Sequence, residues 1–99
     1  MHARSGAFHL STDRVDDAIK AFEDEYLSQY QQQDGYKGFT LLADRESGRL
    51  MGISFWESES DLHAADDLGT RARDDIQQRG EGQSDIERVD WEVVLDDMQ

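Results

Sequence analysis

Residues 34–62 read DGYKGFTLLADRESGRLMGISFWESESDL, and this stretch decides the fold of the chain. Two apolar runs, at residues 36–43 and 50–56, lie on either side of the polar segment 44–49. Gly48 in that segment suits a turn position with a positive φ angle. Because the connection is too short to cross a sheet, we expect the two runs to pair as strands of an antiparallel hairpin.

The remaining elements follow from the spacing of apolar residues outside the hairpin. Residues 6–10 alternate in polarity like a short strand, and residues 87–95 alternate like a longer one. Apolar residues recur at helical spacing over residues 14–32, which predicts an amphipathic helix. Ser58 is a typical N-cap residue, so a second helix is expected to start after the hairpin and to end near Gly80.

The predicted order is strand, helix, strand, strand, helix, strand, which is the ferredoxin-like βαββαβ arrangement of the α+β class. We therefore expect one antiparallel sheet that contains all the strands, with both helices on one of its faces. A chain of 99 residues fits one domain, and residues 1–99 contain no linker that would divide it. We expect a single domain over the whole chain.

Alternation along the strands assigns side chains to the two faces of that sheet. The face toward the helices is predicted to carry Phe8, Leu10, Phe39, Leu41, Ile53, Phe55, Val89, Trp91 and Val93. The opposite face is predicted to carry His9, Thr40, Leu42, Ser54, Trp56 and Val94. Leu42, Trp56 and Val94 make this second face too apolar to remain in water. We therefore expect a homodimer in which two sheets pack face to face as a dimeric α/β barrel.

The composition excludes several classes of partner and site. The chain has 23 acidic residues against 10 lysines and arginines, so nucleic acid is not an expected partner. It has no cysteine, which excludes disulfides and thiolate metal sites. No segment reads as a membrane span or a secretory signal, so we expect a cytoplasmic location and no membrane partner. The net charge of -13 has two interpretations: an ordinary solvated surface, or adaptation to high salt that screens carboxylate repulsion.

Residues 55–58, FWES, end the second hairpin strand and precede the expected second helix. In this context the chain resembles the antibiotic-biosynthesis-monooxygenase-like (ABM) members of the dimeric α/β-barrel superfamily, from its first strand to its last. The resemblance implies a pocket between the sheet and the helices. It implies cofactor-independent monooxygenation of a small aromatic substrate there, and no cofactor is expected. The alternative is a non-catalytic dimeric protein that binds a small ligand or is associated with stress.

Aromatic side chains are the candidate residues of the substrate pocket, although their spacing also suits ordinary core packing. They are Phe22, Tyr26, Tyr30 and Trp91. His63 is the candidate catalytic acid or base, with a solvated helix histidine as the alternative. The family pattern often has its histidine nine residues after the tryptophan, where this chain has Ala65. Two positions along a helix rotate a side chain by about 200°, so His63 should point away from the place of the family histidine.

Two arginines on the expected second helix have two interpretations. Arg71 and Arg73 could clamp an anionic ligand. Alternatively, they pair with acidic residues at helical spacing, which are Asp67, Asp74 and Asp75. The chain also has three histidines, but they are too far apart in the sequence to show metal-ligand spacing. No metal site is therefore expected.

Overall fold

The computed structural model describes residues 1–98, so Gln99, the last residue of the predicted domain, lies outside them. The predicted order of strands and helices is confirmed. The strands are β1 (His2–His9), β2 (Tyr36–Asp44), β3 (Arg49–Trp56) and β4 (Glu87–Glu92). The helical elements are η1 (Thr12–Arg14), α1 (Val15–Ala21), η2 (Phe22–Tyr26), α2 (Leu27–Gln31), α3 (Glu59–Ala64) and α4 (Asp66–Arg79). The first strand begins four residues earlier than predicted, because His2 already pairs with Trp56.

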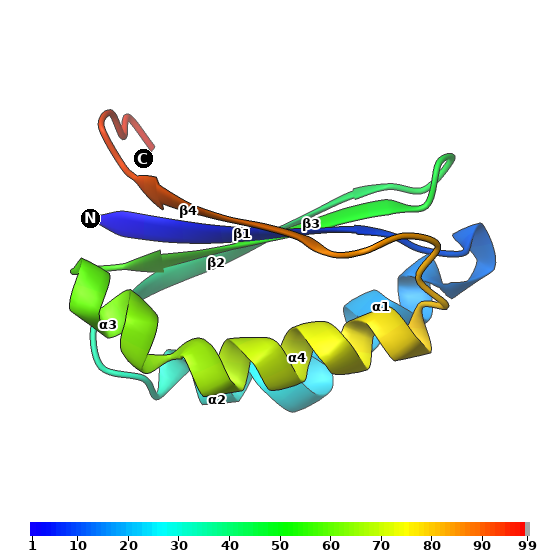
Figure 1. Cartoon of the computed structure of the whole chain (residues 1–99), viewed down its shortest axis with the longest axis horizontal. Coiled ribbons are helices and arrows are strands. Elements are labelled where there is room, and N and C mark those ends of the chain that lie inside the picture. Colours follow the sequence, from blue (N-terminus) through cyan, green and yellow to red (C-terminus); the bar gives the residue numbers. More distant parts are fainter. Residues whose placement is uncertain (99) are drawn as a thin grey trace.

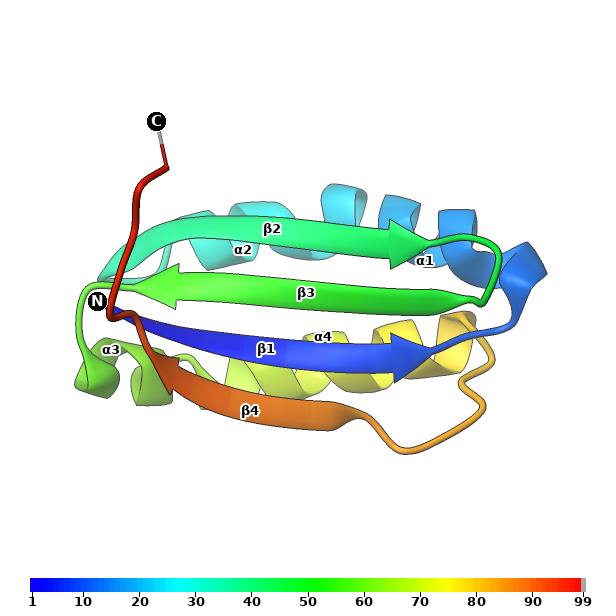
Figure 2. The ribbon, with the colours of Figure 1, turned by 90° about the horizontal axis from the view of Figure 1, so that it is seen from above.

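The strands form one four-stranded antiparallel sheet in the order β2-β3-β1-β4, which is the predicted ferredoxin-like arrangement. The helices lie against one face of this sheet (Figure 1). Figure 2 looks onto the other face, with the helices behind the strands. We call this helix-free side the open face. The strand register gives it the side chains of Ala3, Ser5, Ala7, Thr40, Leu42, Met51, Ile53, Phe55, Val89 and Trp91.

The first helical segment contains one wide turn. α1 and α2 are joined by η2, a π turn over Phe22–Tyr26. A π turn holds more residues than an α-helical turn, so it rotates the residues that follow it relative to a regular helix. Phe22 and Tyr30 are buried in the core, whereas Tyr26 between them is half-buried.

The second helix starts where the sequence predicts it. Ser58 Oγ accepts a hydrogen bond from the backbone N–H of Asp61 at 3.1 Å, which caps α3. The helix is interrupted at Ala65, and α4 then continues to Gly80. The apolar side chains of both helices pack on the sheet: Leu62 of α3 is buried, and so are Leu68, Ala72 and Ile76 of α4. None of the helices within residues 1–98 is both long and apolar enough to cross a membrane.

The predicted faces of β3 are wrong. Ser54 pairs with Arg4 on the helix side of the sheet, and Ser54 and Trp56 are only 6% and 1% exposed. Both were expected on the outward, dimer-forming face. The sequence pattern misleads here because β3 carries apolar side chains on both sides, and the bulkier set, with Ile53 and Phe55, faces outward. When both faces of a strand are to be covered, alternation alone cannot tell which face is which.

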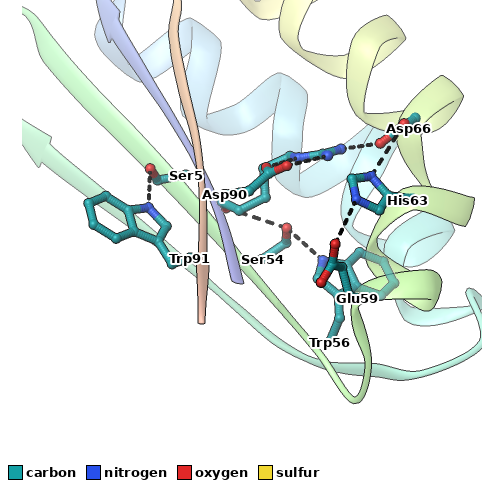
Figure 3. Close-up of polar contacts among 9 residues, drawn as sticks. Ser5, Ser54, Trp56, Glu59, His63, Asp66, Asp90 and Trp91 are labelled. Atoms are coloured by element: carbon teal, nitrogen blue, oxygen red, sulfur yellow. Dashed lines mark hydrogen bonds and ion pairs between the residues drawn. The ribbon is translucent and has the colours of Figure 1, made fainter. Parts of the chain in front are cut away.

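The predicted faces of β4 are also wrong, although polarity alternates regularly along this strand: its charged side, with Asp90 paired to Arg4, lies on the helix side, and its apolar side faces outward. Trp91 lies on the open face, where its Nε1 donates a hydrogen bond to Ser5 Oγ at 2.9 Å, and its side chain is 53% exposed (Figure 3). Val89 shares that face. The strand ends at Glu92, so Val94 is not on the sheet as predicted and is 83% exposed in the segment that follows. That segment lies on the open side of the sheet (Figure 1).

These placements predict the effect of shortening Trp56. Trp56→Ala should lower the free energy of unfolding by about 3–5 kcal/mol, because it empties a buried site and removes the indole bond to Ser54. Val94→Ala, a truncation in the exposed C-terminal segment, should change it by less than about 0.5 kcal/mol. Urea unfolding curves measure both. Equal stability of the two variants would contradict the inward position of Trp56.

Candidate functional site

A cavity lies between the sheet and the helices, and we call it the helix–sheet cavity. One wall comes from β1, β2 and β3, and the other comes from η2, α2 and α4. The cavity spans about 450 Å³ of empty space, part of it open to solvent and much of it narrow. Aromatic rings line it: Phe8, Phe22, Tyr30 and Phe39. The rings of Phe22 and Phe39 stack with their centroids 4.3 Å apart. This lining favours a small, flat, largely apolar molecule.

Polar side chains of the cavity gather at one place. They are Arg4, Tyr30, Ser54 and Arg73. A smaller space of about 190 Å³ shares all of these residues and extends toward Trp56 and Leu62, beside the start of the second helix. Ser54 Oγ accepts a hydrogen bond from Trp56 Nε1 at 2.9 Å (Figure 3). The cavity therefore has an apolar body and one polar end, which is the usual composition of a ligand pocket.

Arg4 on the cavity wall is neutralised by two aspartates. Its side chain is 5% exposed, and its Nε and Nη2 donate to the two carboxylate oxygens of Asp90 at 2.6 and 3.1 Å. Its Nη1 donates to Asp66 at the start of α4. These hydrogen bonds hold the pKa values of both aspartates below their usual range. The group thus joins β1, β4 and α4 around a buried charge.

Two of the four predicted pocket aromatics line the cavity, and two do not. Phe22 and Tyr30 are on its wall, and burial raises the pKa of the Tyr30 phenol, which keeps it neutral. Tyr26 is turned away and donates its hydroxyl hydrogen to Asp75 at 2.6 Å, which raises the pKa of Tyr26 to about 12. The π turn explains its different direction. Trp91 is on the open face of the sheet.

His63 lies outside the helix–sheet cavity. It is exposed on α3 between Glu59 and Asp66, with Nε2 3.7 Å from Glu59 Oε1 and Nδ1 3.8 Å from Asp66 Oδ2 (Figure 3). It lines a separate open hollow with Asp90 and Trp91. His63 is therefore not among the residues that would touch a molecule inside the cavity. Within residues 1–98 there is also no cluster of three or more histidines and carboxylates that suits a metal ion.

Sequence reasoning missed Arg4 and the inward position of Ser54. Arg4 fell outside the predicted first strand because Ser5 and Gly6 weaken its alternating pattern. One signal was available: Arg4 and Asp90 are opposite charges in the first and last strands, and they face each other once the strands are paired.

Two proteins of Mycobacterium tuberculosis are similar to the chain in sequence, and both are uncharacterised. Rv2557 is 31% identical over 94 residues, which cover 95% of this chain and 41% of that protein. Rv2558 is 30% identical over 95 residues, which cover 96% of this chain and 39% of that protein. The chain thus spans about two fifths of the length of these relatives. No protein-family model matches it.

Solved structures identify the fold. The monooxygenase from the gene ActVA-Orf6 of Streptomyces coelicolor, solved with the ligand nanaomycin D, has a TM-score of 0.80 and 12% identity, over 99% of this chain and 91% of that one. An antibiotic biosynthesis monooxygenase has a TM-score of 0.72 and 18% identity, over 96% and 100%. A dimeric ferredoxin-like protein from an uncultured marine organism has a TM-score of 0.73 and 10% identity, over 99% and 91%. The chain therefore has the ABM fold that the FWES segment indicates.

The aspartates around Arg4 predict how stability depends on pH. Because their pKa values are lower in the folded state, the unfolded chain binds more protons in acid. The stabilisation is complete above about pH 4 and is lost as the pH falls through the folded-state values. Asp90→Asn should reduce this acid sensitivity and lower the free energy of unfolding at neutral pH by about 1–3 kcal/mol.

Urea unfolding between neutral pH and about pH 3 measures this effect. Asp67→Asn is the control, because Asp67 is an exposed aspartate beside Asp66 on α4. The Asp67→Asn variant should give nearly the same dependence of stability on pH as the unmodified protein. Parallel profiles for Asp90→Asn and the unmodified protein would show that Asp90 does not couple Arg4 to stability.

Proposed function

We propose that the protein is a cofactor-independent monooxygenase that binds a small aromatic substrate in the helix–sheet cavity. The observation that carries this proposal is the lining of the cavity: aromatic rings around a narrow space with its polar groups at one end. The similarity in fold to monooxygenases supports the reaction class. Stacking against Phe22 and Phe39 would orient a ring, and the polar end would orient its substituents.

The chemistry of this proposal needs only oxygen and an electron-rich substrate. A phenol and O₂ can form a quinone and water: one oxygen atom joins the ring, the other leaves as water, and the substrate supplies the four electrons. The residues that line the cavity would bind the ring, exclude bulk water and stabilise negative charge on the phenol oxygen. Arg73 and the neutral hydroxyl groups of Tyr30 and Ser54 are at the polar end of the cavity.

A second candidate function is binding of a small aromatic ligand without turnover. One observation favours it: within the described residues, the lining of the cavity includes no histidine or carboxylate that would act as a base at neutral pH. His63, the predicted acid or base, faces the separate hollow. The two candidates share the cavity and differ in whether oxygen is consumed.

Ligand binding and oxygen uptake test the proposal together. Phenols, quinols and naphthols should raise the melting temperature, and a ligand at about 100 times its dissociation constant should stabilise the protein by about 2.7 kcal/mol. An oxygen electrode should record uptake in step with quinone absorbance. Ala72→Met should abolish both effects, because Ala72 lines the cavity and the longer side chain fills it.

The matched control is Ala64→Met, which makes the same change at an exposed position of α3. It should retain the binding and activity of the unmodified protein. Thermal stabilisation without oxygen uptake would reject the monooxygenase and support the second candidate. If no compound in the panel binds, both candidates fail.

We also propose that the protein is a homodimer that pairs through the open face. Leu42 and Trp91 are more than half exposed there, with Met51 and Val89 beside them. The small side chains of Ala3, Ser5 and Ala7 on the central strand β1 let a second sheet approach closely. One of the structures similar in fold is a dimeric ferredoxin-like protein, which supports this arrangement. A two-fold axis would bring each face onto its own copy.

Light scattering at micromolar concentration should give twice the 11.3 kDa mass of one chain. Leu42→Asp should shift the protein toward the monomer, because it would bury an unpaired carboxylate in the interface. Gln31→Glu adds the same charge on the helical side, at an exposed residue of α2, and should leave the dimer intact. A monomeric unmodified protein would refute the proposed homodimer.

A further inference from the structure

Arg73 is a cation on the cavity wall that forms no ion pair with any acidic residue that the structure describes. It contributes to the helix–sheet cavity and to the smaller space beside it. Within residues 1–98 it makes no side-chain hydrogen bond or ion pair, so the predicted pairing with Asp67, Asp74 or Asp75 is wrong. Burial lowers the pKa of Arg73, as expected when neighbouring charges do not offset the loss of water.

Two glycines make room for Arg73 inside the molecule. A Cβ atom at Gly69, one helical turn earlier on α4, would lie 2.9 Å from Arg73 Nη1. A Cβ atom at Gly6 on β1 would lie 3.2 Å from Arg73 Cδ. Arginine usually extends its charged end into water. Here the side chain instead lies between the helix and the sheet, in a space that larger residues at either position would narrow.

The missing partner of Arg73 does not reflect a shortage of acidic residues. The chain has 23 of them against 10 lysines and arginines. Arg4 on the opposite wall of the cavity is paired with Asp66 and Asp90, and Arg79 on the same helix as Arg73 is paired with Asp75 and Glu25. The positive charge of Arg73 is therefore left at the polar end of an otherwise apolar cavity, where it would attract an anion.

We propose that the ligand of the helix–sheet cavity is a small aromatic carboxylate and that Arg73 binds its carboxylate group. This inference rests on the proposed function, which places an aromatic ring in the cavity. A guanidinium can hold a carboxylate through two parallel hydrogen bonds, which a single phenolate oxygen cannot accept in the same way. The ring would lie among Phe22, Phe39 and Tyr30, and Ser54 would lie near the bound group.

Benzoate and its neutral analogue benzamide test this proposal in calorimetric titrations at neutral pH. The unmodified protein should bind benzoate about 10-fold to 100-fold more tightly than benzamide. Arg73→Gln should remove that preference and leave benzamide binding unchanged, whereas Arg73→Lys should retain part of it. Arg71→Gln is the matched control, because Arg71 is exposed on the same helix. It should keep the full preference.

Gly69→Ala provides a second test that keeps the charge of Arg73. The added methyl group would displace the flexible guanidinium, while alanine favours the helix, so benzoate binding should weaken at an undiminished melting temperature. A third ligand, 4-nitrophenolate, separates the two kinds of anion. It should bind more weakly than benzoate, and tighter binding would overturn the carboxylate assignment.

The outcomes separate this inference from the proposed function. Equal binding of benzoate and benzamide would overturn the role of Arg73 and leave an aromatic site in place. Undiminished benzoate preference in Arg73→Gln would also overturn it. If neither these compounds nor the phenols and naphthols bind, the aromatic site itself is refuted.

Discussion

The register between β1 and β3 is the constraint on which the rest of the structure depends. It places Arg4 opposite Ser54 and Phe8 opposite Leu50, all on the helix side. A slip by one residue would turn every side chain of β3 to the other face. Trp56 would then leave the core, and the polar end of the cavity would lose Ser54. The same hydrogen-bond ladder therefore determines both the packing of the core and the chemistry of the cavity.

The ion pair between Arg4 and Asp90 attaches β4 at the edge of the sheet. All six residues of β4 are exposed in the single chain, so little apolar burial holds this strand. Its attachment depends on the ladder with β1 and on the paired charges of Arg4 and Asp90. Removing one partner of a buried ion pair usually costs more than the pair contributes, because the remaining charge stays buried. The second aspartate, Asp66, limits that cost and links the strands to α4.

The sequence predicts the order of elements well because turn residues and periodicity are local properties. Gly48, Ser58 and Gly80 mark real boundaries. It fails on the faces of β3 and β4. β3 carries apolar side chains on both sides, and β4 turns its charged side, with Asp90, toward the helices, so only pairing with β1 decides the faces. The family resemblance implies the cavity, and two of the four predicted aromatic residues, Phe22 and Tyr30, line it. Its charged end depends on contacts between distant residues, which no local pattern contains.

The chain's two tryptophans lie on opposite faces of the sheet, and this gives each a different spectroscopic meaning. Trp56 is buried on the helix side, beside the polar end of the cavity, so its fluorescence should change when the chain unfolds and should not respond to a partner on the open face. Trp91 rests on Ser5 with half of its surface uncovered, so its emission should respond to whatever covers the open face. With Trp91 replaced by Phe, the remaining signal would come from Trp56 and would not follow association through the open face. The difference between the two proteins would follow association, without any attached dye.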